Sequence, residues 1–162
     1  MLNCINKLPK MNRLAALVNE LETKIQHSEK LNSAVSEASV SWHIHHGILV
    51  ALKIIDAVEK SNPADYKHEF KLRKLLVFTL NKIPRGRAKA PEAVMPKENI
   101  NGDKLYEQIQ FLKTRLLVLN TLQPANYFKH PVFGNLNLKG TVKMLELHTK
   151  HHLHIINDII KN

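Results

Sequence analysis

The chain has 162 residues, ten histidines, a single cysteine and a formal net charge of +10. This length suits one domain, residues 1–162, which can bury a large core without disulfides or a structural metal. Because Cys4 is the only cysteine, the sequence excludes an internal disulfide and a cysteine-rich zinc site, and it favours a reducing, cytoplasmic setting. No stretch approaches the roughly 18 apolar residues of a membrane span, and the N-terminus lacks the apolar core of a signal peptide. We therefore expect neither membrane insertion nor secretion.

The high positive charge raises the question of nucleic-acid binding, because clustered Lys and Arg side chains release counterions from phosphate backbones. The basic residues are spread along the chain, and the one dense run, Lys82 to Lys89, lies in a stretch with Pro and Gly rather than on a helix. None of the usual nucleic-acid recognition motifs is present. We therefore expect a solvated basic surface, and nucleic acid is the less favoured partner.

Apolar residues recur with the 3.6-residue period of α-helices along most of the chain, and no segment requires a strand. Helices are predicted over residues 12–29, from a cap at Ser36 or Ser39 to Lys60, and over 64–81, 103–122 and 138–160. Pro and Gly interrupt residues 83–102, which predicts a long crossover loop, and loops of this length in compact domains are usually functional or disordered. The predicted fold is an all-α helical bundle in which a turn at 130–134 precedes the last helix.

Four of the ten histidines lie on the last predicted helix, and helical geometry separates them. At about 100° per residue, His148 and His152 fall on the apolar side, whereas His151 lies on the flank and His154 points toward solvent. Residues four apart on a helix are one turn apart, about 6 Å between Cβ atoms, which lets two imidazoles converge on one ion. His148 and His152 are therefore the first candidate metal ligands.

Three further histidines lie early in the second predicted helix. His45 falls on the polar face, while His43 and His46 are inward candidates one turn apart, and periodicity slightly favours His43. We expect His45, like His151 and His154, to be solvated. Since neighbouring helices pack about 8–10 Å apart, imidazoles from both helices can meet across the seam. Three or four histidines would then surround one divalent ion such as Zn or Ni, and hydrogen-bonded core histidines are the alternative.

Four segments carry a resemblance to a known family: Trp42-His-Ile-His-His46, Ile83-Pro-Arg-Gly-Arg-Ala-Lys-Ala-Pro91, His130-Pro-Val-Phe-Gly134 and His148-Thr-Lys-His-His152. Their order along nearly the whole chain resembles the DinB/YfiT superfamily of metalloenzymes, and more narrowly a branch of unknown function within it. The resemblance implies a DinB-like four-helix bundle of up-down-down-up order with short extra helices. By position, it also implies that His46, His148 and His152 hold a divalent metal, and we keep His43 as a supporting or alternative ligand.

The resemblance bears on the chemistry as well, because characterised relatives include metal-dependent transferases and isomerases that use low-molecular-weight thiols. We expect a transferase or hydrolase in which a thiol or water attacks a small-molecule substrate. Arg85 and Arg87 in the long loop are candidate substrate-binding residues, since guanidinium groups hold carboxylates or phosphates by paired hydrogen bonds. His130 is a candidate for the mouth of the cavity, and His43 is a candidate substrate contact.

A second class of function stays open on the sequence alone. In this alternative the protein is a non-catalytic bundle that binds a small ligand or nucleic acid, and its histidines are structural. A homodimer formed through an exposed apolar strip is a further expectation, because bundles of this sort often pair.

Overall fold

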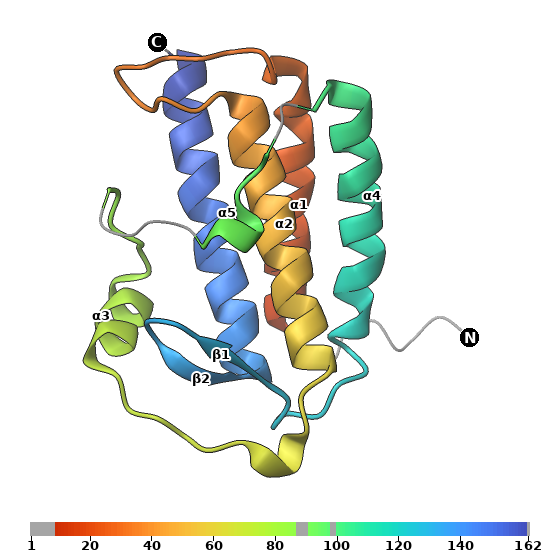
Figure 1. Ribbon diagram of the computed structural model, residues 1–162, viewed down its shortest axis with the longest axis vertical. Coiled ribbons are helices and arrows are strands. Elements are labelled where there is room, and N and C mark those ends of the chain that lie inside the picture. The colour runs from red at the N-terminus through yellow and green to blue at the C-terminus, as the bar shows by residue number, and fades with distance from the viewer. Residues whose placement is uncertain (1–8, 87–90, 98–99, 162) are drawn as a thin grey trace.

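The computed structural model describes residues 9–86, 91–97 and 100–161 and is mostly helical (Figure 1). In chain order the elements are α1 (Pro9–Thr23), η1 (Ile25–His27), α2 (Val40–Glu59), η2 (Pro63–Asp65), α3 (Leu72–Leu80), η3 (Glu92–Val94), α4 (Gly102–Val118), β1 (Tyr127–His130), β2 (Gly134–Asn137) and α5 (Leu138–Lys161). The predicted predominance of helix is confirmed.

The four long helices α1, α2, α4 and α5 lie side by side around one apolar core. In Figure 1, α1 and α5 run upward, whereas α2 and α4 run downward. The α1–α5, α2–α4 and α2–α5 pairs pack most extensively. The largest fully buried side chains of this core come from all four helices: Leu14, Leu21, Ile44, Ile48, Ile55, Leu105, Ile109, Leu112, Leu145 and Leu153. Within the described part of the chain, no helix has both the length and the apolar character needed to cross a bilayer.

Two of the four long helices, α2 and α4, begin at side-chain caps. The extended residue Ser39 precedes α2, and its side-chain oxygen accepts a hydrogen bond from the Trp42 amide at 3.2 Å. Likewise, the Asn101 side chain accepts from the Lys104 amide at 3.0 Å before α4. Such caps satisfy amides that have no partner within the helix and typically stabilise it by about 1 kcal/mol. Of the two predicted caps for the second helix, Ser39 is therefore the one used.

The third helix is shorter than predicted and lies outside the main core. Only Leu72–Leu80 is helical instead of 64–81, and Asn81 ends the helix in the left-handed region with φ of 54°. Val77 and Phe78 pack against a small second cluster formed around Phe133. The remaining large apolar side chains in and next to α3 are exposed: Phe70, Leu72, Leu75, Leu76 and Leu80. Because these residues surround the helix, their spacing does not reveal which side faces the protein.

A short β-hairpin replaces what was predicted as a simple turn, so the expectation that no strand forms is wrong. Strands β1 and β2 pair antiparallel, with Tyr127 opposite Asn137 and His130 opposite Gly134. Gly134 has φ of +69°, a conformation that favours glycine. Each strand has four residues, too few for a two-residue alternation to stand out in the sequence. The hairpin leads directly into α5.

The predicted long connection between α3 and α4 packs against the bundle where its residues are described. Figure 1 shows η3 crossing in front of α2 and α5. Val94 at the end of η3 is buried, and the Ile100 carbonyl accepts a hydrogen bond from the Ser41 hydroxyl at 3.0 Å. The connection therefore covers the N-terminal half of α2, where the histidines lie.

Candidate metal centre

The histidines of α2 and α5 meet inside the bundle. His43 and His46 lie in the first two turns of α2, and His148 and His152 lie near the middle of α5. The side chains of His43, His46 and His152 are buried, at 4%, 3% and 6% exposure, and that of His148 is partly buried. The structure confirms that His148 and His152 of α5 face the interior, as do His43 and His46 of α2.

Three of these side chains converge. One ring nitrogen from each of His46, His148 and His152 lies within 4.8 Å of the other two. The ring centroids are 4.6 Å apart for His148 and His152, 4.9 Å for His46 and His152, and 5.3 Å for His46 and His148. Three imidazoles that share one small volume in this way are close enough to hold a single metal ion.

The hydrogen bond of His46 determines which of its nitrogens faces the cluster. Its Nδ1 lies 2.8 Å from the Val94 carbonyl oxygen. A carbonyl only accepts, so Nδ1 carries the proton and Nε2 keeps its lone pair. Trp42 stacks on the same ring at 5.0 Å between centroids. A ligand histidine whose other nitrogen donates to a backbone carbonyl is the usual arrangement in metal sites, and the residues fit a metal in this respect.

His43 lies behind His152 rather than within the group of three. Its Nδ1 is 3.0 Å from Nδ1 of His152, and its Nε2 is 3.0 Å from the Ser36 hydroxyl. The two inward histidines of α2 therefore differ in role: His46 joins the cluster and His43 contacts a member of it. From the sequence alone, Ser36 is a candidate helix cap, and its contact with His43 is not predictable.

Burial keeps these imidazoles uncharged at neutral pH. Burial, reinforced by neighbouring histidines, lowers the pKa of His43 to about 4 and that of His148 to about 3. Burial also lowers the pKa of His152 well below its ordinary value. The pKa of His46 is lowered by burial although its hydrogen bond to Val94 opposes the shift. Neutral imidazole is the form that binds a metal, so no proton has to leave first.

Of the two arginines predicted to bind substrate, Arg85 falls within the described residues. Arg85 is exposed and forms an ion pair with Asp158 of α5 at 2.6 Å. Arg87 lies outside the described residues. Arg85 nevertheless lines an open groove of about 660 Å³ between α5 and the segment after α3, together with Lys82, Leu147, Lys150, His151 and His154. The His151 ring is 5.2 Å from that of His152, so the groove adjoins the cluster.

His130 stabilises the hairpin turn. Its Nδ1 accepts hydrogen bonds from the amides of Val132 and Phe133 at 3.1 and 3.2 Å, and its ring stacks on that of Phe133 at 4.3 Å. Burial lowers the pKa of His130 to about 4. The residue lies near enough to His148 to influence the pKa of that ring. Its contacts are those of a turn residue beside the site.

One of the histidines expected to be solvated is buried. His45 is only 8% exposed, and Ser41, one turn earlier on α2, is buried with its hydroxyl bonded to the Ile100 carbonyl of the connection before α4. His154 is exposed, as expected, and His151 is partly buried. The prediction that His45 is solvated is therefore wrong. It rested on the polar residues that share its side of α2, and the periodicity of a helix does not show where a connecting segment packs over it.

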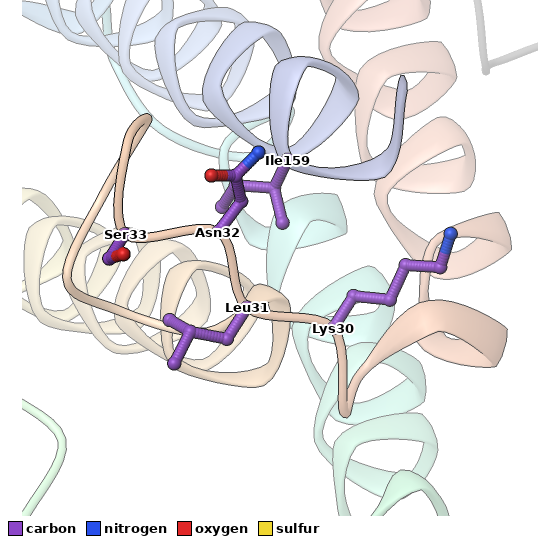
Figure 2. Close-up of a pocket in the computed structure, with 5 residues that line it drawn as sticks. All are labelled: Lys30, Leu31, Asn32, Ser33 and Ile159. Atoms are coloured by element: carbon purple, nitrogen blue, oxygen red, sulfur yellow. The ribbon is translucent and has the colours of Figure 1, made fainter. Parts of the chain in front are cut away.

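A second hollow lies at the end of the bundle. Figure 2 shows Lys30, Leu31, Asn32 and Ser33, from the connection between α1 and α2, near Ile159 of α5. None of these lining residues is a histidine, cysteine or carboxylate. The hollow therefore offers no metal ligands, and the histidine cluster stays the candidate centre.

Comparisons of the chain with protein-family models, with curated proteins and with solved structures gave no match. The interpretation of the site therefore rests on its own residues and geometry.

Proposed function

We propose that the protein is a divalent-metal-dependent enzyme in which His46, His148 and His152 hold the ion. The observation that carries the proposal is the convergence of their three ring nitrogens within 4.8 Å. The neutral state of the rings and the bond from His46 to the Val94 carbonyl support it, because both prepare a lone pair for a metal. The directions of the four long helices agree with the up-down-down-up order of DinB-like proteins, which the sequence motifs resemble.

The ligand set indicates the kind of chemistry. Imidazole ligands suit zinc, nickel and other late first-row ions, and three of them leave room for a further ligand. A divalent ion there supplies Lewis acidity, which lowers the pKa of a thiol or water and polarises a substrate. The proposed reaction is transfer or hydrolysis on a small molecule, with a low-molecular-weight thiol or water as the nucleophile.

The groove beside His151 suggests the side from which a substrate approaches. Its wall carries the cations Lys82, Arg85 and Lys150, and Asp158 offsets one of them. Positive charge at a groove attracts anions and fixes carboxylates or phosphates by charge-assisted hydrogen bonds. We therefore expect an anionic small molecule to be the better substrate.

Turnover tests this proposal. The metal-loaded protein is assayed with thiol-dependent transfer and ester hydrolysis substrates, neutral and anionic, beside two histidine variants. The variant His152→Ala should lose activity, whereas His68→Ala, which changes an exposed histidine outside the groove, should keep it. Equal activity of both variants would contradict a role for the cluster in catalysis.

A further inference from the structure

We infer that His43 is a positioning residue that sets His152 to bind the metal through Nε2. The inference rests on the proposed metal centre and adds a role to a residue outside the ligand set. Two contacts carry it: Nδ1 of His43 lies 3.0 Å from Nδ1 of His152, and Nε2 of His43 lies 3.0 Å from the Ser36 hydroxyl. Both histidines are buried, so the contacts are not exchanged with bulk water.

The Nδ1–Nδ1 contact requires one donor and one acceptor. A neutral imidazole carries a single proton, on Nδ1 or on Nε2. If His43 donates, the proton of His152 lies on Nε2, and that nitrogen cannot bind a metal. If His152 donates, its Nε2 keeps the lone pair and is free to bind. Coordination through Nε2 therefore requires His43 to act as the acceptor.

The Ser36 hydroxyl makes the required form of His43 available. When His43 accepts at Nδ1, its own proton lies on Nε2, and the Ser36 oxygen lies in place to accept it. A hydroxyl can also donate, so Ser36 can pair with His43 whether the His43 proton lies on Nε2 or on Nδ1. Binding of a metal to Nε2 of His152 then selects the form of His43 that is protonated on Nε2. His46 differs, because the Val94 carbonyl allows only one arrangement.

Metal affinity tests the inference without relying on turnover. Zinc binding to the full chain is measured by competition with a chromophoric chelator, for the native protein and for His43→Asn, His43→Leu and the control His154→Leu. The Asn carbonyl can replace the lost acceptor, whereas Leu leaves the Nδ1–H of His152 buried without one. We expect His43→Leu to bind zinc about 10–100-fold more weakly and His43→Asn to stay within a few-fold of the native protein.

Each other outcome has a defined meaning. Native affinity in His43→Leu would overturn the positioning role while leaving the metal centre intact. If both His43 variants lost zinc binding completely, the positioning role would be overturned, and His43 would instead be a metal ligand itself. Absence of binding by the native protein would instead refute the proposed function on which the inference depends.

A measurement without substitution guards against misfolded variants. Long-range ¹H–¹⁵N spectra of the zinc-loaded chain report which nitrogen of each histidine carries a proton. We expect the protons on Nδ1 of His152 and on Nε2 of His43. A proton on Nδ1 of His43 would overturn the inference.

Discussion

Three imidazoles in and beside the cluster each have a ring nitrogen in a defined hydrogen bond. His46 donates to a backbone carbonyl, His43 contacts both Ser36 and His152, and His130 accepts from two amides of its turn. The bonds of His46 and His130 fix which ring nitrogen carries the proton, whereas those of His43 allow either arrangement until His152 binds a metal. The orientation of the cluster therefore depends on loop residues as much as on the helices.

The acid sensitivity of His130 follows from its burial, which lowers the pKa of the ring. Its folded pKa of about 4 lies below the ordinary value of 6.5, so the folded state resists protonation more than the unfolded state does. The stability that this group contributes is present above pH 6.5 and is lost as the pH falls toward 4, by at most about 1.4 kcal/mol per pH unit. NMR titration of the ring should show a midpoint near 4. A midpoint near 6.5 would contradict the buried, accepting role of this side chain.

At the scale of elements, α3 and α4 differ in how much their apolar side chains are covered. Leu112 of α4 is 1% exposed, whereas Leu76 of α3 is 51% exposed. We expect Leu112→Ala to lower the free energy of unfolding by about 2–5 kcal/mol, because it leaves a cavity in the core. Leu76→Ala should cost less than about 1 kcal/mol. Urea denaturation of the metal-free variants measures both, and equal losses would mean that the outer face of α3 is covered in solution.

The sequence predicted long helices better than short elements. In α5, lysines on one side and apolar residues on the other repeat over many turns, so the inward placement of His148 and His152 could be predicted. In α3 the apolar residues surround a helix of nine residues, and each hairpin strand has only four. Neither is long enough for a period to identify the buried face.

Partners distant in sequence could not be predicted. His46 and the Val94 carbonyl are 48 positions apart, and the donor meets its acceptor only because the connection before α4 folds over α2. Ser36 reaches His43 from the connection that precedes α2. These contacts depend on how the loops fold in space. Loops have no regular period, so a single sequence does not show which loop atom will contact which ring.

For the whole molecule, a metal that binds only the folded chain should raise its stability. At a free zinc concentration of 100 times the dissociation constant, linkage gives about 2.7 kcal/mol. For a chain of this size that corresponds to a rise in Tm of about 5–10 °C. Differential scanning calorimetry should show the rise for the native protein and for His154→Ala but not for the double variant His148→Ala/His152→Ala. An equal rise in the double variant would place the stabilising metal elsewhere.

The most direct test of the metal centre is elemental analysis of the purified, tag-free chain after incubation with zinc or nickel and removal of free ions. We expect about one ion per chain in the native protein and in His154→Ala, and almost none in His148→Ala/His152→Ala. A native protein that retains no ion, or a double variant that retains as much as the native protein, would contradict this expectation and leave the histidines as hydrogen-bonded groups of the core.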